Sequence, residues 1–280
     1  MITRVLQDID PAKWNEHLYG LTPERWARLR GRSYWITGAG TGYGRCIACA
    51  LASAGAQVFL TGRRVEKLQE SIEEIAALNI STDNCYTVEA DLTNYNEVIK
   101  ACERVKSLCN SLSGLVNNAA MPTEPGSREP LQNGSLEYWN RMMATNVTAA
   151  WLLTRMMFPY MLLGSNVRVL FISSEAGWAN DTPGNGMYKV SKAALNGLGR
   201  AAACEYAHAF PDQDIQMNVL VPGEARTEMN RGSVRSPYAM VSMALMLLSH
   251  PEGGPNGRYF HCDGRHLNFG NAPPYDKPLI

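Results

Sequence analysis

Two residues four apart in the sequence could together move a proton. In Tyr188-Lys189-Val190-Ser191-Lys192, the tyrosine and the second lysine are separated by about one helical turn, so they share a face of a helix. A phenol with a pKa of about 10 is a poor base at neutral pH, and a neighbouring ammonium lowers that pKa by stabilising the phenolate. The pair could then exchange a proton with a substrate oxygen. Taken alone, this spacing is more often structural.

A serine and an asparagine place further polar groups in apolar surroundings. Ser174 follows the apolar run of residues 169–172, so it lies just after a predicted strand, where parallel sheets bind ligands. Its hydroxyl could hydrogen-bond a reacting carbonyl, although a serine there also commonly forms a turn. Asn146 lies within an apolar helical pattern, where a buried amide requires a hydrogen-bonding partner.

A glycine-rich turn is the second chemical signal. It follows one apolar run and precedes a helical stretch of small residues, and a second apolar run begins near residue 58. This order of strand, glycine turn, helix and strand is typical of dinucleotide sites. Glycine lets the backbone turn tightly and lets a pyrophosphate approach the N-terminus of the helix. The residues predicted to hold the dinucleotide here are Thr37, Gly38, Gly40, Thr41, Gly42, Tyr43 and Gly44.

The end of the next predicted strand indicates which dinucleotide binds. Many NAD sites carry an acidic residue there, which holds the ribose hydroxyls. This strand ends in Gly62-Arg63-Arg64 and has no carboxylate. Guanidinium groups suit a 2′-phosphate, because they form bidentate, charge-assisted hydrogen bonds. The sequence therefore predicts that Arg63 and Arg64 bind NADP(H) in preference to NAD(H).

From Ser33 onwards, short apolar runs alternate with helical patterns. This alternation predicts an α/β fold with a doubly wound parallel sheet that is covered by helices on both faces. The predicted strands are residues 34–37, 58–61, 85–90, 115–117, 167–172, 216–221 and 259–262. The predicted helices are residues 65–78, 95–112, 136–163, 187–210 and 238–249.

Two shorter segments flank this predicted sheet domain, which spans residues 33–265. Asp10-Pro11 and Thr22-Pro23 each match a helix N-cap followed by proline at the first helical position. Residues 1–32 are therefore expected to form two short helices, with Trp14 and Trp26 as packing anchors. Residues 266–280 are expected to form a C-terminal tail.

The composition excludes several other classes of protein. The 280 residues carry 26 basic and 26 acidic side chains, without the basic excess that is usual for nucleic-acid binding. The first ten residues lack the apolar run of a signal peptide, and no stretch reaches the roughly 18 apolar residues of a membrane span. Seven scattered cysteines, an odd number, fit free thiols in a reducing compartment, so a cytoplasmic protein is expected.

The cysteines and histidines show no metal or redox pattern. Cys46 and Cys49 have the spacing of a reactive pair, but packing on the buried face of a helix of small residues explains them better. The five histidines are dispersed along the chain. No metal site is therefore predicted.

Together and in this order, the motifs resemble the short-chain dehydrogenase/reductase family over residues 33–264. The glycine turn matches the family motif Thr-Gly-x-x-x-Gly-x-Gly. The other residues identified by the resemblance are Asp91 and Leu92 near the adenine, Asn118 and Ala119 of an Asn-Asn-Ala-Gly-like motif, Asn146, Ser174, Tyr188 and Lys192 of the active site, and Pro222, Gly223 and Thr227 of the segment that closes over the nicotinamide.

The resemblance implies a Rossmann sheet of about seven strands and an enzyme that transfers hydride between a nicotinamide and a carbonyl or secondary alcohol. It implies that Tyr188 is the catalytic acid/base and that Ser174 polarises the substrate oxygen. Lys192 would lower the pKa of Tyr188 and bind the nicotinamide ribose, and Asn146 would hold a water that links Lys192 to solvent. Family members are commonly homotetramers or homodimers.

The sequence departs from the family pattern on the substrate side. Glu175 follows Ser174 where small residues are commoner, Glu224 follows Pro222-Gly223, and the loop of residues 228–236 is short. Such charges either make a polar, open cleft for a polar small molecule or belong to a mobile surface loop. Two alternatives stay open. One is an NAD-dependent sugar or sugar-nucleotide dehydrogenase or epimerase, and the other is a non-catalytic regulator that binds the cofactor on the same fold.

Overall fold

Eight strands form one sheet in the described part of the chain, which comprises residues 11–122, 131–178 and 183–267 of a computed structural model. The strands lie in the order β3-β2-β1-β4-β5-β6-β7-β8, and all neighbouring pairs are parallel except β7 and β8. They are β1 (Ser33–Thr37), β2 (Gln57–Gly62), β3 (Cys85–Glu89), β4 (Gly114–Asn117), β5 (Val167–Ile172), β6 (Ile215–Val221), β7 (Tyr259–His261) and β8 (His266–Leu267). The predicted doubly wound sheet is thus confirmed, and the short antiparallel β8 adds one strand to it.

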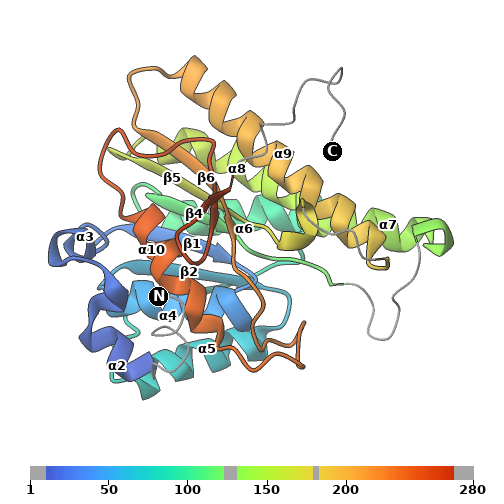
Figure 1. Ribbon diagram of the computed structural model, residues 1–280. Helices are drawn as coiled ribbons and strands as arrows, with labels where there is room; N and C mark the ends of the chain where they lie inside the picture. The colour runs from blue at the N-terminus through green and yellow to red at the C-terminus, as the bar shows by residue number, and fades with distance from the viewer. Residues whose placement is uncertain (1–10, 123–130, 179–182, 268–280) are drawn as a thin grey trace, which may run out of the picture.

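Helices cover both faces of this sheet, as Figure 1 shows. On one face lie α4 (Gly42–Ser53), α5 (Val65–Ala77) and α10 (Val241–Leu248), and on the other α6 (Tyr95–Leu108), α8 (Ala149–Met161) and α9 (Gly186–Ala209). Successive side chains of a strand point to opposite faces, so Ile36 joins the first core and Trp35 the second. No helix in the described residues is long and apolar enough to cross a membrane.

The single long helix predicted over residues 136–163 is interrupted in the structure. It consists of α7 (Leu136–Met143) and α8, joined by the π-helical turn Ala144–Thr148. Such a turn inserts an extra residue into the helical repeat and changes the direction of nearby side chains. Asn146 lies in this turn and is almost completely buried.

The N-terminal extension contains the two predicted helices, α2 (Pro11–Glu16) and α3 (Pro23–Ala27). Trp14 and Trp26 are buried in ring contact with Tyr19, and the Tyr19 ring stacks on that of Tyr238 with 6.4 Å between centroids. Tyr238 lies just before α10, so the extension packs against the segment that leads into this helix (Figure 1).

The structure confirms only some of the predictions for residues 1–32 and for the C-terminal tail. The Thr22 hydroxyl accepts a hydrogen bond from the Arg25 amide at 3.4 Å, as an N-cap does. The other predicted N-cap, Asp10, lies outside the described residues, as do residues 268–280 of the predicted tail. The first two residues of that tail form β8.

The Cys46 and Cys49 side chains are buried on α4 as free thiols. Burial raises the pKa of Cys49 to about 12, so it stays protonated at neutral pH. This agrees with the prediction that the pair serves packing.

A buried ion pair joins three elements at the amino ends of the strands, opposite the end where ligands bind. Arg168, in β5, is 1% exposed. Its guanidinium lies 2.5 Å from the carboxylate of Asp214, which precedes β6, and 2.8 Å from the carbonyl oxygen of His250, which follows α10. Loss of the carboxylate would leave an uncompensated charge in the core.

We therefore expect Asp214→Asn to lower the free energy of unfolding by about 3–5 kcal/mol, the usual effect of removing one partner of a buried pair. Urea unfolding of the purified variant measures the change. Asp212→Asn, at an exposed carboxylate two residues away, is the matched control and should change stability by no more than about 0.5 kcal/mol. Equal effects of the two substitutions would contradict a structural role for the buried pair.

Candidate active site

A cleft of about 530 Å³ opens at the carboxyl ends of the parallel strands, where doubly wound sheets bind ligands. Most of the predicted site residues line it, namely Gly38, Gly40, Thr41, Gly42, Tyr43, Arg63, Arg64, Asp91, Leu92, Asn118, Ala119, Ser174, Tyr188, Lys192, Pro222, Gly223 and Thr227. Thr37, Gly44 and Asn146 are not part of the lining and support it from behind.

The glycine turn has the shape that a pyrophosphate requires. Gly38 and Gly42 have φ angles of +64° and +55°, in the left-handed region that favours glycine. A Cβ at Gly44 would lie 2.6 Å from the side-chain nitrogen of Asn118, so a larger residue would separate the two. The side chain of Thr41 makes no capping hydrogen bond, which leaves the first amides of α4 available to an anion. These residues therefore fit a dinucleotide phosphate.

Thr37 and Asn118 tie the ends of β1 and β4 together. The Thr37 hydroxyl donates to the carbonyl of Val116 at 3.2 Å and accepts from the amides of Asn118 and Ala119, both at 3.0 Å. The Asn118 side chain donates back to the carbonyl oxygens of Thr37 at 2.8 Å and Gly38 at 3.2 Å. Thr37 therefore positions the floor of the cleft without lining it.

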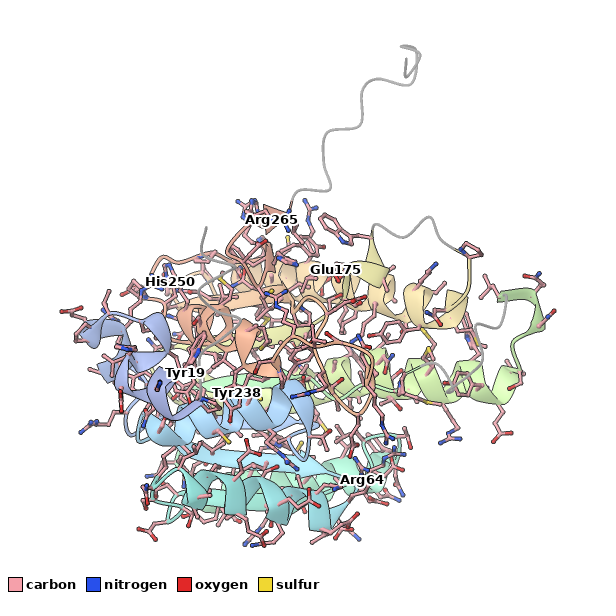
Figure 2. The ribbon with its side chains drawn as sticks, turned by 60° about the horizontal axis from the view of Figure 1, so that its bottom comes forward. Tyr19, Arg64, Glu175, Tyr238, His250 and Arg265 are labelled. Carbon is pink, nitrogen blue, oxygen red and sulfur yellow. The ribbon has the colours of Figure 1, made fainter. Side chains whose placement is uncertain are left out.

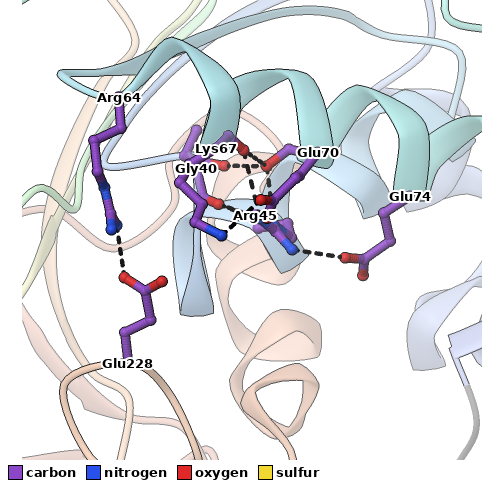
Figure 3. Close-up of polar contacts among 9 residues, drawn as sticks. Gly40, Arg45, Arg64, Lys67, Glu70, Glu74 and Glu228 are labelled. Carbon is purple, nitrogen blue, oxygen red and sulfur yellow. Dashed lines mark hydrogen bonds and ion pairs between the residues drawn. The ribbon is translucent and has the colours of Figure 1, made fainter.

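One end of the cleft carries three cations. Arg63 and Arg64 follow β2, and Lys67, which the sequence analysis missed, lies one helical turn further along α5. Arg64 forms an ion pair of 2.6 Å with Glu228 of the loop on the facing wall, as Figure 3 shows. The i,i+3 spacing of Arg64 and Lys67 was a signal that could have identified the third cation.

Arg45 holds the glycine turn against α5 (Figure 3). Its Nε donates to the Gly40 carbonyl at 3.0 Å, and its terminal nitrogens pair with Glu70 at 3.1 Å and Glu74 at 3.3 Å. Glu74 also accepts a hydrogen bond from the Tyr238 hydroxyl at 3.0 Å. This network links the turn to the segment before α10.

At the other end of the cleft, Ser174, Tyr188 and Lys192 come together. Ser174 follows β5, and its hydroxyl hydrogen-bonds the hydroxyl of Tyr188, near the start of α9. The Lys192 Nζ lies 5.7 Å from the centroid of the Tyr188 ring and donates to the Ile172 carbonyl at 2.9 Å. The structure thus joins two segments of chain that the sequence only suggested would meet.

The pKa of Tyr188 lies above the usual value of a phenol. The pKa is raised to about 12. Burial is the main cause, the Ser174 hydroxyl opposes it, and the Glu175 carboxylate adds to it. Burial also lowers the pKa of Lys192 to about 8. Desolvation of the phenol therefore dominates, while the Lys192 ammonium is directed at the Ile172 carbonyl. That Lys192 lowers the pKa of Tyr188 stays a prediction.

Asn146 connects the segment after β4 to α9. Its side-chain oxygen accepts from the Met121 amide at 2.6 Å, and its nitrogen donates to the Ser191 hydroxyl at 3.0 Å. The buried amide therefore has the partners that the sequence analysis required of it. Its role in holding a water stays a prediction.

On the substrate side, the cleft is lined by Glu175 and Glu224. The sequence analysis noted both as departures but missed His261, at the end of β7, whose Nε2 lies 3.1 Å from the Glu175 carboxylate. No motif joins these two residues, which are 86 positions apart.

Comparison with known proteins assigns the chain to a family. The family model for short chain dehydrogenases matches residues 33–237. The chain is 29% identical over 254 residues to the 3-oxoacyl-[acyl-carrier-protein] reductase FabG of Aquifex aeolicus, covering 85% of this chain and 98% of that protein. It is 25% identical over 257 residues to the 5-keto-D-gluconate 5-reductase of Escherichia coli, covering 84% and 95%.

A solved structure supports the same assignment. A short chain dehydrogenase from Escherichia coli CFT073, complexed with NADPH, has a TM-score of 0.75 and 25% identity, with 85% of this chain and 98% of that chain covered. The chain therefore belongs to the short-chain dehydrogenase/reductase family and is an NAD(P)-dependent oxidoreductase.

The buried Lys192 should destabilise the fold while its ammonium is charged. Because its pKa is lower in the folded protein than in the unfolded chain, the unfolded chain binds more protons between about pH 8 and pH 10.5, and stability rises with pH through this window. Lys192→Met removes this penalty, which is at most about 3 kcal/mol at pH 7, although the Ile172 carbonyl loses a hydrogen bond worth about 1 kcal/mol.

We expect the stability of Lys192→Met relative to the wild type to be highest at pH 7 and to decline towards pH 10. Urea unfolding at both pH values measures this change. Lys100→Met, at an exposed lysine of α6, is the control and should show no such trend. A Lys192→Met difference that is independent of pH would contradict the lowered pKa.

Proposed function

We propose that the protein is an NADP(H)-dependent carbonyl reductase or alcohol dehydrogenase that acts on a polar small molecule. The observation that carries this proposal is the meeting of Ser174, Tyr188 and Lys192 in the cleft whose other end is formed by the glycine turn and the arginines after β2. A nicotinamide bound between the two ends would supply or accept the hydride.

Tyr188 would act as the proton donor in the direction of reduction. Because its pKa is about 12, the hydroxyl is protonated at neutral pH and can give its proton to the oxygen of a carbonyl as hydride arrives. Ser174 would donate a second hydrogen bond to the same oxygen, since its hydroxyl already lies against that of Tyr188. In the direction of oxidation, the proton would return to Tyr188.

Lys192 and Asn146 would support this centre in different ways. The ammonium of Lys192 has one proton on the Ile172 carbonyl and two others for the ribose hydroxyls of the nicotinamide. Asn146 acts as a positioning residue, since its amide holds the start of α9 through Ser191.

The cofactor is proposed to be NADP(H) rather than NAD(H). The cleft wall after β2 presents Gly62, Arg63, Arg64 and Lys67 and no carboxylate of its own, which suits a 2′-phosphate. The structural relative solved with NADPH supports the same choice. The phosphate would compete with Glu228 for Arg64.

We also propose that the protein is a cytoplasmic homotetramer or homodimer. Trp151 of α8 and Val190 of α9 are 47% and 37% exposed, and such apolar groups on neighbouring helices favour burial against a second copy.

Tyr188→Phe should retain NADPH binding and lose most of its turnover. Only the hydroxyl that transfers the proton is removed, and general acid–base catalysis typically contributes about a hundred- to ten-thousand-fold. A panel of polar carbonyl compounds and alcohols, followed at the nicotinamide absorbance, identifies a substrate for this measurement. Near-wild-type turnover by the variant would show that Tyr188 is not the acid, although the protein would still be an enzyme.

The cofactor preference should reverse in the double variant Gly62→Asp, Arg63→Leu. A carboxylate at position 62 repels a 2′-phosphate and accepts hydrogen bonds from free ribose hydroxyls, and the loss of a charged hydrogen bond changes affinity by about ten- to a hundredfold. A Cβ at Gly62 would lie 3.3 Å from a methyl group of Leu68, so the new side chain requires only a small adjustment.

Titration of NADPH and NADH into the wild type and the double variant measures both affinities. Arg104→Leu, which removes an exposed arginine of α6, controls for the loss of a surface charge. A wild type that prefers NADH would refute the proposal, and so would a ratio that the double variant leaves unchanged.

A further inference from the structure

Glu175 places a carboxylate in the same cleft as the proposed proton donor, Tyr188. It begins the short 3-10 turn Glu175–Gly177 after Ser174, it lines the cleft, and its side chain is 44% exposed. Burial is the main reason why the pKa values of Tyr188 and Tyr43 are raised, and the Glu175 carboxylate adds to both. Its charge therefore reaches the place where the substrate oxygen would bind.

His261 and Asp263 hold this carboxylate from behind. The His261 side chain is 8% exposed, its Nε2 lies 3.1 Å from Glu175 Oε1, and its Nδ1 lies 2.9 Å from Asp263 Oδ1. Asp263 is held in turn by Arg265, 2.8 Å away. Figure 2 shows Glu175 and Arg265 on the side of the molecule away from Arg64. One oxygen of Glu175 is thus occupied by His261, and the other has no partner among the described residues.

The two ends of the cleft carry side chains of opposite charge. Arg63, Arg64 and Lys67 lie at the end proposed for the 2′-phosphate, where Arg64 pairs with Glu228 and Lys67 with Glu70. Glu175 and Glu224 lie at the other end, and neither forms an ion pair with a lysine or arginine in the described part of the chain.

No lysine or arginine among the described residues pairs with these carboxylates, and Glu175 has only the His261 ring, which lies between it and Asp263. Lys192 is buried and donates to the Ile172 carbonyl. Arg235 is directed at the Cys262 sulfur, 3.5 Å away, and does not line the cleft. A substrate that enters this end therefore meets a surface that accepts hydrogen bonds and is negatively charged.

We propose that Glu175 selects substrates in which a hydrogen-bond donor, a hydroxyl or an ammonium group, flanks the reacting carbonyl, and that it disfavours a carboxylate there. The unoccupied oxygen of Glu175 accepts a bond from the flanking donor, and charge makes this bond strongest for an ammonium. A flanking carboxylate would face a like charge. This inference rests on the proposed function of the same cleft.

Three methyl ketones that differ only in the flanking group test the selection. Aminoacetone, hydroxyacetone and acetoacetate carry an ammonium, a hydroxyl and a carboxylate on the carbon beside the carbonyl, and their reduction is followed by NADPH oxidation at pH 7. For the wild type we expect kcat/KM to fall in that order, by about tenfold or more from the first to the last. Glu175→Gln should bring the three values to within about threefold of one another. Glu205→Gln, which removes an exposed carboxylate of α9 outside the cleft, should leave the wild-type order intact.

Variants of His261 test the role of the residues behind Glu175. His261→Phe removes the ring nitrogen that contacts the carboxylate and should raise KM for aminoacetone several-fold while kcat changes little. His261→Gln retains a donor and should restore much of the affinity. A general loss of folding would instead lower the amount of active protein and leave KM unchanged in both variants.

Each outcome separates the inference from the function on which it rests. If acetoacetate is the best of the three ketones, or if Glu175→Gln leaves the ratios unchanged, the selection by Glu175 is refuted while the reductase stands. If the wild type oxidises NADPH with none of these ketones and with no compound of the wider panel, the proposed function itself fails, and the inference fails with it.

Discussion

The hydrogen bonds between Thr37 and Asn118 are the contact on which the rest of the site depends. They join β1 to β4 at the point where the strand order changes direction, between the β3-β2-β1 half and the half that begins with β4. Parallel strands at such a point diverge beyond their carboxyl ends and leave a crevice. The Asn118 side chain spans this crevice and leaves no space for a Cβ at Gly44, so the first turn of α4 can approach the strand ends closely. The position of the glycine turn, and hence of any phosphate bound to it, follows from this contact.

The two groups proposed to move the proton are both held where water cannot solvate them fully. Burial raises the pKa of Tyr188 and lowers that of Lys192, so each group is biased towards its neutral form. For Tyr188 this bias favours a proton donor at neutral pH and thus the direction of reduction. For Lys192 it means that the fold carries an ammonium whose burial opposes stability. A site that functions at the expense of stability is a common arrangement in enzymes.

The cleft has a basic end and an acidic end, although the chain as a whole has no net charge. The chain carries 26 basic and 26 acidic residues, yet the arginines after β2 gather at one end and Glu175 and Glu224 at the other. Arg45 connects the glycine turn to α5, and Arg64 connects the segment after β2 to the loop that carries Glu228 (Figure 3). Under the proposed function, the separation would give one end of the cleft affinity for phosphate and the other for donors of hydrogen bonds. Binding of cofactor and choice of substrate can therefore be altered by different residues.

The sequence by itself determined the order of strands and helices, the place of the glycine turn, the absence of a carboxylate after β2 and the spacing of Tyr188 and Lys192. All of these are local features, because helical and strand periodicity and glycine conformation depend on residues close together in the chain. Only the tertiary structure decided the π-helical turn at Asn146, the raised pKa of Tyr188 and the contact of His261 with Glu175. The first accompanies hydrogen bonds of Asn146 to Met121 and Ser191, the second depends on burial, and the third joins side chains 86 residues apart. Burial and long-range contacts arise only when the sheet brings distant segments together, and for that reason no local pattern of residues could predict them.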